Sequence, residues 1–146
     1  MKGFVTTVVA ALICTSAAAG SELDVAYDWR PSLTVEADFD RDGRMDSAQL
    51  GVAAGGVGLR ATLNAHPLPI IDIPTDGSKA FGICPGGEPS IHIAAQSEAP
   101  LNALGETPRG YEICEKCVEI VVGGGECDAL HFYWDTATRQ LAWWRA

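Results

Sequence analysis

The sequence predicts an all-β domain, a small antiparallel sandwich or barrel-like fold, and three observations carry that prediction. Apolar and polar residues alternate with a period of two along most segments after residue 30, which is the pattern of half-buried strands. Clusters rich in Gly and Pro separate these segments: AAGGVG, HPLP, CPGGEP, TPRG and VVGGGE. Helical periodicity is nearly absent. We therefore expect roughly seven to nine short, mostly antiparallel strands.

The alternating segments follow one another along the chain, and each is short enough to be a single strand. In the first, Leu33, Val35 and Ala37 alternate with Thr34 and Glu36. Further alternating segments cover residues 47–52, 59–63, 91–93 and 118–122. The stretch 96–110 shows the least pattern, and we expect a loop or one short helix there.

The end of the chain has the clearest hairpin pattern, because ALHFYWD and QLAWWRA flank the four-residue connection TATR. Pairing Asp135 with Gln140 places on one face, which we expect to be the core face, Leu130, Phe132, Trp134, Leu141 and Trp143. The other face carries His131, Tyr133, Ala142 and Trp144. Flat aromatic rings supply contact area at low entropy cost, so His131, Tyr133 and Trp144 form a candidate binding face. The alternative is that a second sheet or a loop covers them.

The N-terminal segment has the composition of a secretory signal peptide. Met1 and Lys2 precede the apolar run FVTTVVAALIC, and TSAAAG follows it. We predict a signal peptide over residues 1–19, cleavage after Ala19, and a single domain over 20–146 in the periplasm or outside the cell. Cys14 raises lipid attachment as an alternative, which the bulky Ile13 before it disfavours. No later segment reaches 18 uncharged apolar residues, so we expect no membrane span.

The expected mature protein is strongly acidic. Removing 19 of the 146 residues leaves 127, which fits one domain with a real core. Lys2 is the only charged residue removed, so the net charge changes from −9 to −10. Such a surface repels nucleic acid and anionic membranes, and it favours cations or basic partners.

Four aspartates crowd into nine residues of the stretch ADFDRDGRMDSAQL, namely Asp38, Asp40, Asp42 and Asp46. Like charges repel, so a chain keeps such a cluster where something offsets the repulsion. The first three occupy positions 1, 3 and 5 of a D-x-D-x-D-G pattern, in which Gly43 permits the sharp turn and the carbonyl of Arg44 can serve as the position-7 ligand. Oxygen-only ligands select a hard cation. We therefore predict bound Ca²⁺ in this loop, rather than a solvated acidic turn.

The loop departs from an EF-hand, because position 12 is Gln49 rather than Glu and the flanks LTVEADF and MDSAQLGVA alternate as strands. Asp46, at position 9, can supply the missing bidentate contact. This D-x-D-x-D-G-x-x-D hairpin resembles the calcium hairpins of integrin-type FG-GAP repeats. It is also similar to a group of short exported bacterial proteins with one such hairpin and an aromatic ending, here FYWDTATRQLAWW. The resemblance implies the ligands Asp38, Asp40, Asp42, the Arg44 carbonyl and Asp46. We expect the ion to be mainly structural.

Four cysteines remain after the predicted cleavage: Cys84, Cys114, Cys117 and Cys127. An even number in an exported chain indicates disulfides, although the sequence does not choose among the three pairings. Cys114 and Cys117 form a C-x-x-C, which in a redox enzyme sits at a helix N-terminus. Here VEIVV follows as a strand, so we expect two structural disulfides. A redox pair and a zinc knuckle are the alternatives.

No catalytic constellation stands out. His66, His92 and His131 lack a G-x-S-x-G elbow or an H-E-x-x-H helix beside them, so we expect surface or cross-strand roles. The prediction is thus an exported calcium-binding β domain without catalytic machinery, acting as a binding module for a protein or glycan partner. One alternative is an inhibitor or partner of a secreted basic protein such as a hydrolase. Another is a C-x-x-C thiol–disulfide oxidoreductase.

Overall fold

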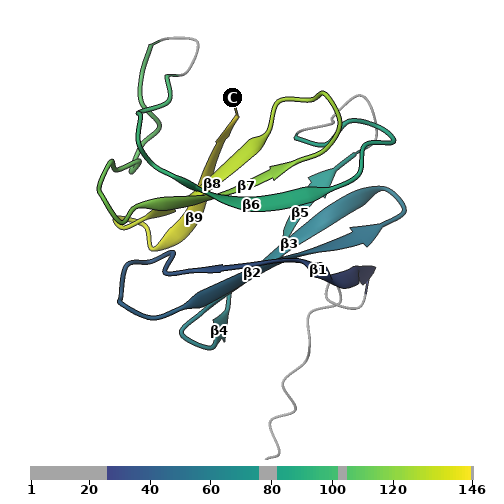
Figure 1. The fold of residues 1–146 in the computed structure, drawn as a ribbon, viewed down its shortest axis with the longest axis horizontal. Coiled ribbons are helices and arrows are strands. Elements are labelled where there is room, and N and C mark those ends of the chain that lie inside the picture. Colours follow the sequence, from purple (N-terminus) through teal and green to yellow (C-terminus); the bar gives the residue numbers. More distant parts are fainter. Residues whose placement is uncertain (1–25, 76–81, 102–104, 146) are drawn as a thin grey trace, which may run out of the picture.

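The computed structural model describes residues 26–75, 82–101 and 105–145, and the secondary structure elements in these ranges are all strands. They form two antiparallel sheets that pack face to face (Figure 1). The all-β prediction is confirmed, and the two sheets form a sandwich rather than a closed barrel. The predicted signal peptide and its cleavage site lie outside the described residues. Among the described residues, no helix has the length and apolar character needed to cross a membrane.

The first sheet contains five strands: β1 (Asp28–Ala37), β2 (Asp46–Ala53), β3 (Gly56–Leu63), β4 (His66–Pro67) and β5 (Ile71–Pro74). β1, β2 and β3 pair in order, and both β4 and β5 pair with β3. The HPLP cluster, expected to separate strands, instead begins with β4. Leu63 pairs with His66 across a two-residue turn in which Asn64 and Ala65 both have positive φ, as a tight hairpin requires.

β1 begins five residues before the alternation that predicted it. Trp29 pairs with Gly51 and Thr34 pairs with Gln49, so four residues of β1 bulge opposite a single residue of β2. Pro31 lies in this bulge. Pro cannot donate to a ladder and is tolerated at bulges and on edge strands. The sequence does not predict this first part of β1, because apolar and polar residues do not alternate in DWRPS.

The second sheet contains β6 (Ser90–Ala95), β7 (Val118–Gly123), β8 (Leu130–Asp135) and β9 (Gln140–Arg145), paired in chain order. The predicted register of the last hairpin is confirmed, from the pair Asp135 and Gln140 to the pair Leu130 and Arg145. The described parts of the stretch 96–110 form a loop rather than a helix.

The core lies between the two sheets. Leu50, Leu59 and Ile73 come from the first sheet, and Ile120 and Phe132 come from the second, each at most 2% exposed. Trp134 and Leu141 pack against this cluster.

The prediction that Trp143 is a core residue was wrong, because its side chain is 53% exposed. It belongs to β9, the edge strand of the second sheet. The part of the first sheet nearest to Trp143 is β5, which has only four residues. The first sheet therefore covers little of the Trp143 ring. Trp143 therefore lines an open groove together with Ile71 and Pro74.

Candidate functional site

The acidic loop connects β1 to β2 at one end of the sandwich. Gly43 has φ +86°, and a side chain there would meet no neighbouring atom, so the sharp turn requires Gly for its backbone conformation and not for space. Arg41 also has a positive φ, +63°, which an L-residue adopts only when its surroundings hold it. The loop thus has the turn that the D-x-D-x-D-G pattern predicts.

Three carboxylates converge inside this loop. Asp38, Asp40 and Asp42 each place one oxygen within 4.8 Å of the others. A backbone amide donates to each of the three. Gly43 N donates to Asp38 Oδ2 at 2.9 Å, Asp42 N donates to Asp40 Oδ1 at 3.2 Å, and Arg44 N donates to Asp42 Oδ1 at 2.9 Å. The three side chains therefore form a compact oxygen-only cluster, the donor type that Ca²⁺ prefers.

The electrostatics of the cluster disfavour the fully charged state. Burial raises the pKa of Asp40, and the negative charges of Asp46, Asp42 and Asp38 raise it further, against one backbone hydrogen bond that lowers it. A bound divalent cation would reverse this balance by offsetting the mutual repulsion. The residues present thus fit a hard divalent cation in both their chemistry and their charge.

Asp46 lies outside the group of three converging carboxylates, although its charge reaches Asp40. It is 3% exposed, and its two oxygens accept hydrogen bonds from the backbone amides of Phe39 at 2.9 Å and Asn64 at 3.1 Å. It therefore ties the loop to the β3–β4 turn. The sequence carried a signal for this burial, because Asp46 is in phase with the inward residues Ala48 and Leu50.

Asn64 is a site residue that the sequence reasoning missed. Its side-chain amide donates to Asp42 Oδ2, and its carbonyl oxygen accepts a hydrogen bond from Arg44 Nη1 at 3.0 Å. It belongs to the tight β3–β4 turn, far along the chain from the aspartates. Only the pairing of β2 with β3 brings it beside the loop, so no local pattern could reveal it. The Arg44 carbonyl stays a predicted ligand.

The four cysteines of the described chain form two disulfides, Cys84–Cys127 and Cys114–Cys117. The first joins residues 43 apart and holds the loop before β6 to the loop after β7. In the chain-entropy model a loop of that length is worth about 4 kcal/mol, and a loop of four residues about 2 kcal/mol. Cys84–Cys127 therefore contributes more to the stability of the fold, and Cys114–Cys117 constrains only one tight turn.

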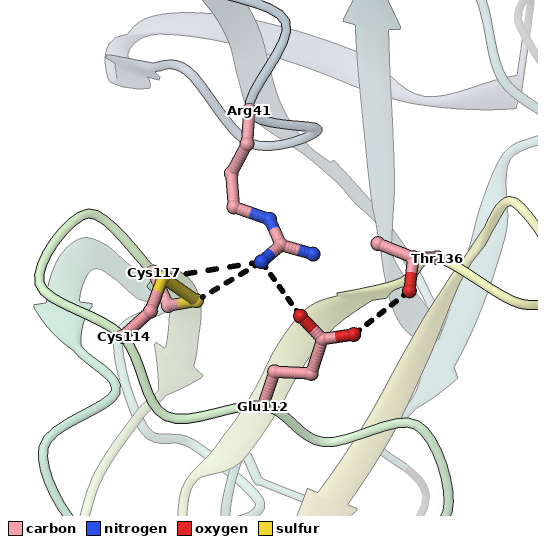
Figure 2. The surroundings of a disulfide bond; sticks show 5 residues. All are labelled: Arg41, Glu112, Cys114, Cys117 and Thr136. Carbon is pink, nitrogen blue, oxygen red and sulfur yellow. Dashed lines mark hydrogen bonds and ion pairs between the residues drawn. A yellow bond between two sulfur atoms is a disulfide. The ribbon is translucent and has the colours of Figure 1, made fainter.

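Arg41 connects the acidic loop to the C-x-x-C turn of the second sheet (Figure 2). Its Nη1 donates to Glu112 Oε2 at 2.6 Å and lies 3.5 Å from Cys117 Sγ and 3.9 Å from Cys114 Sγ. Glu112 also accepts a hydrogen bond from Thr136 Oγ1 at 2.9 Å. Hydrogen bonds from Arg41 and then Thr136 lower the pKa of Glu112. The loop that carries the aspartates is thus docked against the other sheet.

The residues of the candidate binding face contact one another and the preceding loop. Tyr133 is 2% exposed and donates its hydroxyl to the Arg109 carbonyl at 2.7 Å. His131 stacks on Trp144 with 4.0 Å between ring centroids. Both also bond to the buried carboxylate of Glu119, His131 through Nδ1 at 2.7 Å and Trp144 through Nε1 at 3.2 Å. The loop through Arg109 therefore covers Tyr133, whereas His131 and Trp144 remain half-buried. His66 and His92 are exposed.

A second aromatic group, which the sequence reasoning missed, lies on the outer face of the first sheet. The Tyr27 and Trp29 rings pack 5.4 Å apart, and the Arg60 guanidinium lies 4.3 Å from the Trp29 ring centroid. Beneath them are Gly51 and Gly58, which pair across β2 and β3. A Cβ at Gly51 would approach the Trp29 ring to 2.7 Å, so these glycines make room for the rings.

Comparisons of the chain with protein-family models, with curated proteins and with solved structures found no match. The resemblance of the acidic loop to FG-GAP-type calcium hairpins therefore stays a prediction.

Proposed function

We propose that this protein is an exported β-sandwich domain that binds one Ca²⁺ ion in the loop between β1 and β2, where the ion has a mainly structural role. The observation that carries the proposal is the convergence of Asp38, Asp40 and Asp42 within 4.8 Å in a D-x-D-x-D-G turn. Asp38, Asp40 and Asp42 would supply side-chain oxygens and Arg44 its carbonyl, and Asp46 is the further ligand that the spacing of the loop predicts.

The surroundings of the loop support a structural role for the ion. Asp46 anchors the loop to the β3–β4 turn, and Arg41 docks it on Glu112, which lies in the loop between β6 and β7. An ion that offsets the repulsion among the three aspartates would hold both of these contacts in place. Calcium would therefore stabilise the junction between the two sheets rather than take part in a reaction.

Export is supported by the two disulfides, which persist in oxidising compartments. Calcium reaches millimolar concentrations outside cells, where sites of weak affinity are loaded. The proposed site does not need the tight binding of an intracellular calcium buffer.

The test is thermal unfolding of residues 20–146, with disulfides intact, in calcium and in chelator. Calcium at 100 times its dissociation constant should add about 2.7 kcal/mol to the free energy of unfolding. For a domain of this size that corresponds to a rise of roughly 10 °C in Tm. Asp40→Asn should abolish the rise. Asp28→Asn makes the same chemical change on an exposed strand residue outside the loop, and it should keep the rise.

A wild-type protein with the same Tm in chelator and in millimolar calcium would contradict the proposal. So would a calcium-dependent rise that Asp40→Asn retains in full, because the ion would then bind elsewhere. Magnesium serves as the selectivity control. It demands a stricter octahedral geometry, so it should stabilise the protein less than calcium does.

A further inference from the structure

The Cys114–Cys117 disulfide differs from the Cys84–Cys127 disulfide in its chemical surroundings. Cys114 is exposed, whereas Cys117 is 2% exposed, so only one of the two sulfurs is open to attack from solvent. The guanidinium of Arg41 lies closer to the buried sulfur, at 3.5 Å from Cys117 Sγ. Arg41 donates to Glu112, and Glu112 is held in turn by a hydrogen bond from Thr136, so the guanidinium is fixed in this position (Figure 2).

This asymmetry is what thiol–disulfide exchange requires. The rate of exchange depends on access to the sulfur that is attacked and on how well the departing sulfur carries negative charge. A neighbouring guanidinium stabilises a thiolate. Attack at Cys114 would release Cys117 as a thiolate beside Arg41, so the structure offers both an accessible sulfur and a stabilised leaving group. A disulfide that only braces a turn needs neither.

We propose that Cys114–Cys117 is a thiol–disulfide exchange site that oxidises dithiols of exported proteins or peptides, with Arg41 as the residue that stabilises the leaving sulfur. A substrate thiolate attacks Cys114 Sγ, the Cys114–Cys117 bond breaks, and its electron pair leaves on Cys117 Sγ. A second substrate thiolate then attacks the substrate sulfur of the mixed disulfide, and Cys114 leaves as a thiolate. The substrate gains a disulfide, and the two cysteines are reduced by two electrons and take up the two substrate protons.

The residue before Cys114 favours a polypeptide substrate. Ile113 is 55% exposed, which is unusual for a large apolar side chain, and it would contact a substrate held at Cys114. Cys84–Cys127 has a different setting, because the glycine-rich loop after β7 runs close beside it: a Cβ added at Gly125 would lie 3.1 Å from the Cβ of Cys84. We therefore expect exchange at Cys114–Cys117 first.

The experiment is the reduction of the mature protein, residues 20–146, by excess glutathione, run in parallel in calcium and in chelator, so that a failure of calcium binding and a failure of exchange can be told apart. Mass spectrometry of acid-quenched, alkylated samples identifies the first cysteine to carry glutathione and the rate at which each disulfide opens. We expect glutathione on Cys114. Arg41→Gln should slow this step by about fivefold to tenfold, and Arg41→Lys should restore much of the rate. Arg30→Gln, which removes an equal charge from β1, should leave the rate unchanged.

Three outcomes would overturn the proposal. In the first, glutathione appears first on Cys117 or on the Cys84–Cys127 pair. In the second, Arg41→Gln is reduced as fast as wild type or faster, which would make Arg41 a purely structural clamp. In the third, Arg41→Lys behaves like Arg41→Gln. The opening rate of Cys84–Cys127 in each variant is the internal control, since a change confined to Cys114–Cys117 excludes general unfolding.

Discussion

Two roles are possible for Asp46. Its spacing in the loop predicts a calcium ligand, whereas its hydrogen bonds indicate a structural anchor. The substitution Asp46→Ala distinguishes between them. The carboxylate accepts hydrogen bonds from Phe39 N in a buried setting and from Asn64 N in a partly buried one. A hydrogen bond to a charged group contributes about 1.5–3 kcal/mol. Since Asn64 N is only partly buried, we expect Asp46→Ala to lower the free energy of unfolding by about 3–4 kcal/mol.

The assay is urea unfolding of residues 20–146 in chelator, where no ligand role can contribute. Asp46→Asn, which keeps one acceptor oxygen, should fall between wild type and Asp46→Ala. Asp40→Ala is the matched control in the same loop. Because burial and neighbouring charges raise the pKa of Asp40, removing this carboxylate should cost little stability in chelator and can raise it.

The reasoning would be refuted if Asp46→Ala matched wild type in chelator to within about 0.5 kcal/mol, the range of a surface substitution away from any special contact. A loss of stability that appears only when calcium is present would give Asp46 the ligand role and remove the anchor role.

Three further predictions concern the contacts around the sheets. Gly58→Ala places a Cβ 3.0 Å from the Tyr27 ring and should cost about 1–3 kcal/mol in urea unfolding, whereas Gly55→Ala has open space and should not. Tyr133→Phe removes the hydrogen bond to the Arg109 carbonyl and should cost about 1 kcal/mol, measured the same way. The lowered pKa of Glu112 means that its contribution to stability is present above pH 4.5, its unperturbed value, and is lost as pH falls through the lower folded-state value. Stability measured against pH should therefore fall less for Glu112→Gln than for wild type over that acid range.

The sequence predicted the sheets well where alternation was strong. The last hairpin, from Leu130 to Arg145, was placed in its correct register because the connection length and the aromatic pattern agree. β5 and the first half of β1 were missed, since IDIP is too short and DWRPS does not alternate. Trp143 was misassigned because the pattern identifies the face of a strand but not how far the opposite sheet extends.

The candidate site was only partly readable from the sequence. The three converging aspartates come from one loop, so local spacing was sufficient to find them. Asn64, Arg41 and Glu112 act through contacts between distant segments, and only the packed structure brings those segments together. The asymmetry of the C-x-x-C turn has the same origin. The two cysteines are neighbours in the sequence, whereas Arg41 comes from the distant loop between β1 and β2.

The most direct test of the proposed function is equilibrium dialysis of residues 20–146 against radioactive calcium at millimolar concentration. We predict one calcium ion bound per chain, and none for Asp40→Asn at the same concentration. The absence of bound calcium in the wild-type protein would contradict the account, and so would a full equivalent retained by Asp40→Asn.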